Sequence, residues 1–194
     1  NYQGDNRYLY GIVSYAGDVI FEQGIGEDGL VSLYFGNGNS AYGIAALQGS
    51  VSITGDMAGT IRVEMGISHG GCGIYAAEDV TVTEDISGSI YARGGSGSGY
   101  GVMSDGGDIA IAQISGSVTG DCYNEKMANS QQGASALYAN SGSIYGGKDE
   151  DTVTPIDLTG TLSSTVGRSG AYTVQADGDV YITLGEDASI KAQS

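Results

Sequence analysis

Short runs of alternating apolar and polar residues cover almost the whole chain, and glycines separate them. Between Ser40 and Glu64 three such runs follow one another, at Tyr42–Ala46, Val51–Ile53 and Ile61–Val63. Alternation with a period of two is typical of half-buried β-strands, and glycine between two runs is typical of a turn. We therefore predict three short strands within this stretch.

The three-strand unit recurs along the chain at intervals of about 30 residues. The aliphatic position of the first predicted strand is occupied by Ile12, Ile44, Ile74, Val102, Leu137 and Val174. Two residues later comes a small residue, at Ser14, Ala46, Ala76, Ser104, Ala139 and Ala176. The second predicted strand begins at Val19, Val51, Val80, Ile109, Ile144 and Val180. The third contains Val31, Ile61, Ile90, Val118, Leu162 and Ile190. The three series advance along the chain together, so each repeat unit carries one member of each series.

A unit this short cannot bury its apolar side alone, whereas stacked units bury that side against one another. We therefore predict an all-β fold for residues 1–194, as a single domain. It is a right-handed parallel β-helix, a solenoid of about six coils of roughly 30 residues with three strands each. A β-sandwich is the alternative, because its strands have a similar spacing. The common phase of the three series favours the β-helix.

Two polar, turn-rich insertions interrupt the repeat, at residues 120–134 and 147–159. We expect both to be loops that leave the rod, since a solenoid tolerates insertions that do not break its interior stack. They are the candidate contact loops for a polar partner. Their candidate contact residues are Tyr123, Glu125, Lys126, Asn129, Gln131, Asp149, Glu150 and Asp151.

The chain is strongly acidic, with 7 Lys and Arg against 23 Asp and Glu and a formal net charge of -16. Such a surface repels phosphate backbones and anionic lipid headgroups, so nucleic acid and membrane surfaces are poor partners. No apolar run approaches the roughly 20 residues of a membrane span, so no membrane insertion is expected within this segment. The pattern begins without a leader or a cap, which suggests an excerpt of a longer surface protein.

Metal and thiol chemistry have few candidates. His69 lies near Cys72, but a metal site needs three or four ligands and a thiol nucleophile needs a positioned base. The acids at residues 149–151 lack the spacing of a calcium loop. No cofactor or metal is therefore expected. Cys72 and Cys122 fall on different coils, so we predict two free thiols.

Acids and tyrosines follow the repeat. Most acids fall in predicted turns, where aspartate usually bonds to local backbone: Asp18, Asp56, Asp79, Asp108, Asp121 and Asp179. There are 14 tyrosines, two phenylalanines and no tryptophan. One column of the repeat, expected inside or at a corner with its hydroxyls reaching outward, holds Tyr10, Tyr42, Tyr100 and Tyr172. A second set has the parity opposite to the core and can present rings outward to a glycan or a protein: Tyr75, Tyr91, Tyr138, Tyr145 and Tyr181.

The recurring Tyr-Gly-Ile, Gly-Asp-Val and Ser-Gly-Ser-Ile elements, in an acidic and glycine-rich chain, resemble the passenger repeats of autotransporter-type bacterial surface proteins. The resemblance covers residues 8–192 and includes no catalytic motif. It implies a bacterial β-helix that is extracellular or lies at the cell surface, associated with the outer membrane.

These observations favour a non-enzymatic stalk or adhesin-like binding scaffold. Its expected partners are host or environmental glycans, surface proteins and neighbouring repeats of the same chain. The alternative is a β-helix that binds or cleaves glycans, similar to a polysaccharide lyase or hydrolase. An enzyme of that kind should gather several acids in a groove on one face, whereas a stalk should distribute them among its corners.

Overall fold

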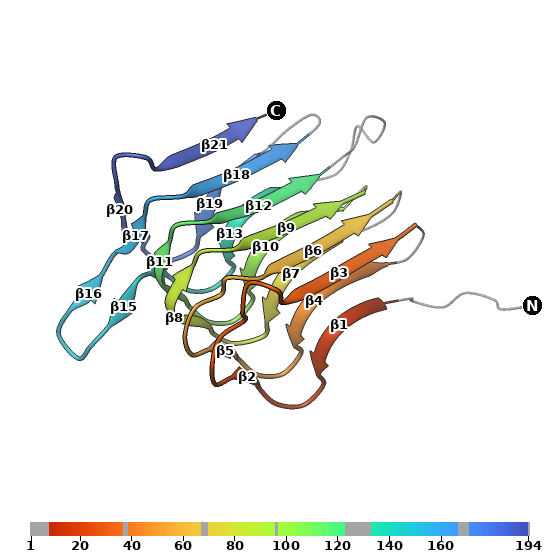
Figure 1. Ribbon diagram of the computed structural model, residues 1–194, viewed down its shortest axis with the longest axis horizontal. Helices are drawn as coiled ribbons and strands as arrows, with labels where there is room; N and C mark the ends of the chain where they lie inside the picture. Colours follow the sequence, from red (N-terminus) through yellow and green to blue (C-terminus); the bar gives the residue numbers. More distant parts are fainter. Residues whose placement is uncertain are drawn as a thin grey trace, which may run out of the picture.

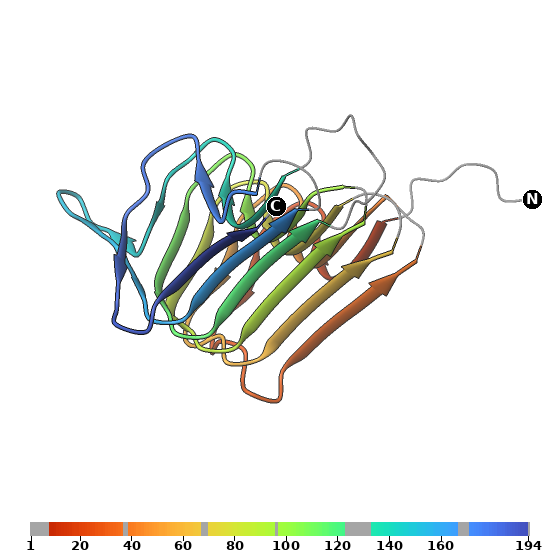
Figure 2. The same ribbon diagram turned by 90° about the horizontal axis from the view of Figure 1, so that it is seen from above.

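The computed structural model describes residues 8–36, 39–66, 70–95, 97–122, 133–166 and 171–193. These residues fold as the predicted right-handed parallel β-helix, in which three sheets run along a rod of six stacked coils (Figure 1). The coils follow one another in sequence order, from the first at one end to the last at the other (Figure 2). No helix long and apolar enough to cross a membrane occurs among the described residues.

Each coil contributes one strand, or in one case two short strands, to each sheet. The first sheet consists of β1 (Tyr8–Ser14), β4 (Ser40–Ala46), β7 (Gly70–Ala76), β10 (Gly99–Ser104), β13 (Ala134–Ala139) and β19 (Val174–Ala176). The second consists of β2 (Val19–Phe21), β5 (Val51–Ile53), β8 (Val80–Ile86), β11 (Ile109–Ile114), β14 (Ile144–Tyr145), β17 (Ile156–Leu158) and β20 (Ile182–Leu184). The third consists of β3 (Leu30–Phe35), β6 (Thr60–Met65), β9 (Ser89–Gly94), β12 (Ser117–Cys122), β18 (Thr161–Val166) and β21 (Ser189–Gln193).

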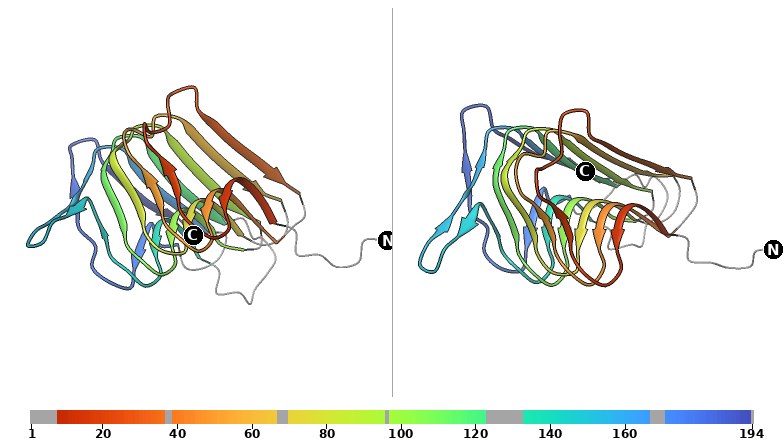
Figure 3. Two further views of the ribbon diagram at one scale, coloured as in Figure 1. Left: turned by 90° about the horizontal axis from the view of Figure 1, so that it is seen from below. Right: turned by 60° about the horizontal axis from the view of Figure 1, so that its bottom comes forward.

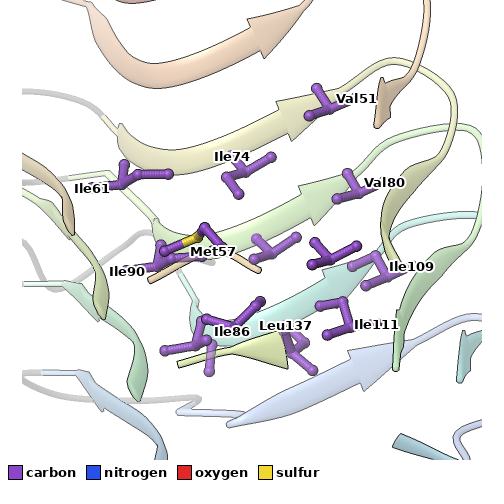
Figure 4. Close-up of a cluster of buried hydrophobic side chains, with 14 of the residues drawn as sticks. Val51, Met57, Ile61, Ile74, Val80, Ile86, Ile90, Ile109, Ile111 and Leu137 are labelled. Atoms are coloured by element: carbon purple, nitrogen blue, oxygen red, sulfur yellow. The ribbon is translucent and has the colours of Figure 1, made fainter. Parts of the chain in front are cut away.

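All three predicted aliphatic columns are confirmed by the strand register. In the first sheet Ile12 pairs with Ile44, Ile44 with Ile74, and the column continues to Val174. The columns from Val19 and from Val31 align in the same way in the second and third sheets. Away from the two ends of the rod their side chains meet inside and form one continuous hydrophobic core (Figure 4), whereas Ile12, Val180 and Ile190 in the end coils are partly exposed. Stacking therefore buries what a single coil cannot.

Glycine in the Tyr-Gly-Ile element is required by packing. A Cβ at Gly43 would lie 2.6 Å from Ile61 Cγ2, in the third sheet, and 2.6 Å from the carbonyl oxygen of Gly73. A Cβ at Gly73 would meet Ile90 Cγ2 and the carbonyl oxygen of Gly101 in the same way. These glycines let the curved strands of the first sheet approach the third sheet (Figure 3).

The second insertion leaves the rod, but its predicted end is wrong. Residues 147–154 form an antiparallel hairpin of β15 (Gly147–Lys148) and β16 (Val153–Thr154), which projects from the stack (Figure 1). The chain then returns to the second sheet, where β17 pairs with the end of β11. Ile156 and Leu158 are fully buried and belong to the core. The hairpin thus interrupts a strand of the second sheet instead of following it.

The first insertion is shorter than predicted at both ends. β12 continues through Cys122 and β13 begins at Ala134, so residues 120–122 and 134 are strand and not loop. Five of the candidate contact residues lie outside the described residues, namely Tyr123, Glu125, Lys126, Asn129 and Gln131. Cys72 and Cys122 are buried free thiols.

Candidate functional site

Tyrosine rings gather on the first sheet outside the hydrophobic core. One column of the strand register reads Tyr10, Tyr42, Cys72, Tyr100 and Ser135. A second column, three residues further along each strand, reads Val13, Ala45, Tyr75, Met103 and Tyr138. The columns are complementary in size, because tyrosine in one column stands beside a smaller side chain in the other. Tyr75 and Tyr138, which the sequence pattern assigns to a separate set, therefore share one surface with Tyr10, Tyr42 and Tyr100.

The rings contact one another in two groups. Tyr10 stacks on Tyr42 with centroids 5.5 Å apart, and Tyr75 tilts against Tyr42 at 5.3 Å. Tyr100 stacks on Tyr138 at 4.9 Å. These separations are those of favourable aromatic pairs. Among the described residues, no ring contact joins Tyr75 to Tyr100, so the row of rings is interrupted there.

A hollow of about 320 Å³ occupies this interruption. Tyr42 on β4 and Tyr100 on β10 lie on its two sides, and Gly71 and Cys72 on β7 lie between them. Cys72 is buried, and its thiol donates to the carbonyl oxygen of Ile74 at 3.1 Å. The small thiol stands where three other coils carry a tyrosine, which leaves the space open.

The hollow is polar along part of its lining. Ser40, Ser98 and Asp105 line it beside the rings. Asn140 Nδ2 donates to Asp105 Oδ1 at 2.9 Å, and the hydroxyl of Tyr138 donates to Asn140 Oδ1 at 2.8 Å. This chain of hydrogen bonds holds the Asp105 carboxylate in place.

Burial affects the pKa values of the tyrosine hydroxyls that line the hollow. It raises the pKa of Tyr42 to about 12, with the neighbouring Cys72 thiol adding to the shift. The pKa values of Tyr75 and Tyr100 are also raised, mainly by burial, and the Asp105 carboxylate contributes for Tyr75. All three hydroxyls are therefore protonated at neutral pH and can donate hydrogen bonds.

Corner acids form a ladder along the rod. In one corner each coil supplies a side-chain oxygen that accepts from a backbone N–H of the next coil. Thus Asp18 accepts from Ser50 N, and Asp79 accepts from Asp108 N, at 2.9 and 2.7 Å. The column of acceptors is Asp18, Ser50, Asp79, Asp108 and Ser143. For Asp18, Asp79 and Asp108 the expectation of local backbone bonding is wrong, because their bonds join successive coils.

A second polar group, which the sequence pattern does not reveal, lies on the third sheet. Glu64, Arg93 and Asp121 are neighbours in successive strands, and Arg93 Nη2 lies 3.9 Å from Glu64 Oε2. Asp121 lies in β12 and not in a turn as predicted. Burial raises its pKa, while hydrogen bonds from Thr165 and Tyr91 and the charge of Arg93 oppose the shift.

The remaining candidates are not brought together. Asp149, Glu150 and Asp151 are exposed between the two strands of the hairpin. Lys148 of the hairpin lines a separate hollow with Thr81, Thr83 and Tyr145 against the second sheet. In the parts of the chain that the structure describes, no group of three or more His, Cys, Asp or Glu residues could hold a metal ion. His69 lies outside those parts.

No family model, curated protein or solved structure matches this chain significantly.

Proposed function

We propose that this protein is a non-enzymatic β-helical module, a stalk or adhesin-like binding scaffold at a bacterial cell surface or in the extracellular space. Its partners are glycans or surface proteins, which it contacts through its side faces and its projecting hairpin. The observation that carries the proposal is the ladder of corner acids. Asp18, Asp79 and Asp108 hold neighbouring coils together by accepting backbone hydrogen bonds. Their carboxylates thus serve the rod instead of a reaction.

The acidic surface and the extracellular location are compatible. A net charge of -16 keeps a rod soluble and discourages contact with anionic polymers. The tyrosine-rich face of the first sheet is of the kind that serves recognition, because tyrosine combines an apolar ring with a polar hydroxyl.

The test combines adhesion with turnover. The 194-residue protein is incubated with a panel of insoluble neutral and acidic polysaccharides and with whole bacterial cells. Retained protein, new reducing ends and unsaturated products are then measured. We expect retention on at least one surface without any product. Enzymatic release of product, or no retention on any glycan or bacterial surface, would contradict the proposal.

The hairpin remains a candidate contact loop. A variant in which residues 149–152 are replaced by a Gly-Ser turn should keep its stability, because the three acids there are exposed. If the hairpin carries adhesion, retention should fall. Unchanged retention would indicate that another face of the rod carries adhesion.

A glycan-cleaving β-helix is the second candidate, and the group on the third sheet favours it. Asp121, with its raised pKa, and Glu64 lie on either side of Arg93, two strand spacings or about 9.6 Å apart. Carboxyl groups at about that separation serve as the acid and base of inverting glycosidases. Any cleavage in the assay above should then be lost in Glu64→Gln and in Asp121→Asn, and retained in Asp79→Asn.

A further inference from the structure

We propose that the hollow at Cys72 is a binding site for one pyranose ring of a neutral glycan. The inference rests on the proposed scaffold function and adds the location of the site and the class of its ligand. It is carried by the interrupted row of rings, the polar groups beside it and the charge of the protein.

The spacing of the strands suits a single ring. Tyr42 and Tyr100 come from β4 and β10, which flank β7. Two strand spacings amount to about 9.6 Å. The stacked rings along this surface are 4.9 to 5.5 Å apart. Within this width Tyr75 on β7 tilts against Tyr42 at 5.3 Å and makes no ring contact with Tyr100, so an added ring would lie in the hollow on the Tyr100 side of Tyr75 and continue the row there. A volume of about 320 Å³ is at the lower end of the range for ligand pockets and suits one sugar unit.

The chemistry of the lining favours a sugar over an aromatic side chain. A pyranose has apolar C–H faces, which pack on tyrosine rings, and hydroxyl groups around its edge, which need donors and acceptors. Ser40, Ser98 and Asp105 supply such groups next to the rings. The Asp105 carboxylate is held by Asn140, so it is positioned before a ligand arrives. An aromatic side chain would leave these polar groups unmatched.

The charge of the protein selects among sugars. A net charge of -16 and a carboxylate in the lining repel uronic acids and sulfated units. The ligand is therefore a neutral glycan, bound through one unit while the rest of the polymer runs over the surface of the rod.

The chain offers matched variants for this site. Cys72→Tyr places a tyrosine in β7 at the position where the neighbouring coils carry Tyr42 and Tyr100, and so fills the hollow. Cys72→Ser keeps the side chain small and is its control. Tyr100→Ala removes one side of the hollow, and Tyr34→Ala is its control because Tyr34 is 72% exposed on the third sheet.

Binding is measured by isothermal titration calorimetry with hexasaccharides of glucose, mannose and xylose, with hexagalacturonate and with N-acetyltyrosinamide. Circular dichroism and urea unfolding check the fold of every variant. We expect at least one neutral hexasaccharide to bind more tightly than hexagalacturonate and N-acetyltyrosinamide. Cys72→Tyr and Tyr100→Ala should each weaken that binding by about tenfold or more. The two controls should stay within about twofold of the parent. If Cys72→Tyr does not fold, Tyr100→Ala carries the test.

Three results would overturn the site. They are no binding of any neutral hexasaccharide, equal binding by all variants, and tighter binding of hexagalacturonate or N-acetyltyrosinamide. Equal binding by all variants, with retention of the parent on a glycan, would refute the site and leave the scaffold function standing. Cleavage of a hexasaccharide would instead refute the scaffold function.

Discussion

Replacing Ile74 with alanine should destabilise the rod strongly, whereas the same replacement of Ile12 should cost little. Both residues belong to one aliphatic column of the first sheet. Ile74 is fully buried, with Ile44 and Val102 in the strands on either side, while Ile12 is 39% exposed in the first coil. The two variants therefore compare the same substitution at a buried and at a partly exposed position of one column.

The expected losses in unfolding free energy follow from how deeply each isoleucine is buried. Truncation of a fully buried isoleucine costs about 2 to 5 kcal/mol, because transfer free energy is lost and a cavity is left. Ile12 buries less apolar area and its site opens to solvent, so we expect a cost of about 1 kcal/mol. With a urea dependence of about 2 kcal/mol per molar, the Ile74 variant should unfold about 1 to 2.5 M earlier than the parent. The Ile12 variant should shift by about 0.5 M.

Urea unfolding followed by far-ultraviolet circular dichroism and by tyrosine fluorescence measures both shifts. The two probes check that the transition is cooperative, which a solenoid does not guarantee. Equal shifts in the two variants would refute the assignment of this column to a continuous interior stack.

Three further variants test other parts of the fold. Gly43→Ala should cost several kcal/mol in urea unfolding, because its Cβ would meet backbone of the next coil at 2.6 Å, whereas Gly26→Ala, with nothing within 4 Å, should be almost neutral. Asp79→Ala removes the acceptor for the Asp108 amide and should cost about 1 kcal/mol, while Asp79→Asn should recover most of that loss; equal losses would argue against the ladder. The pKa of Tyr42 is raised from 10.0 to about 12, so its contribution to stability is complete below pH 10 and is lost as the pH rises towards 12. The urea midpoint should therefore fall more steeply over that pH range in the parent than in Tyr42→Phe, and identical slopes would contradict the burial of this phenol.

The coil architecture could be predicted from the sequence because each aliphatic column repeats one chemical requirement. A residue that faces the interior needs an apolar neighbour in the coil above and below, so the requirement recurs at the coil length. The registers from Ile12, Val19 and Val31 follow directly from that recurrence. The alternation also indicates where strands begin, but it does not locate the end of the second insertion. Ile156 and Leu158 alternate with polar neighbours over only three residues, too short a run to be distinguished from the preceding loop.

The tyrosine-lined hollow could not be predicted, because strict alternation fails at the glycine before the aliphatic position. Gly43 and Ile44 are consecutive, yet both face the core: a Cβ on the glycine would meet Ile61, and Ile44 is fully buried. Alternation therefore shifts by one residue at this point. Tyr42 and Ile44 are two residues apart, so strict alternation would place both on the same side of the strand. Tyr42 nevertheless turns outward and contacts Tyr75, which stands one residue after the core position of its own strand. Only the packing between sheets, which requires the glycine, determines this shift.

The corner ladder has a mechanical consequence for the rod. Its hydrogen bonds connect each coil to the next coil along the axis, from a side chain of one to a backbone amide of the other. A force that pulls on the two ends of the chain therefore meets a series of similar junctions. Under such tension the coils should detach one at a time, each releasing about 100 Å of extended polypeptide. A force–extension trace should then show a regular sawtooth with one peak per coil.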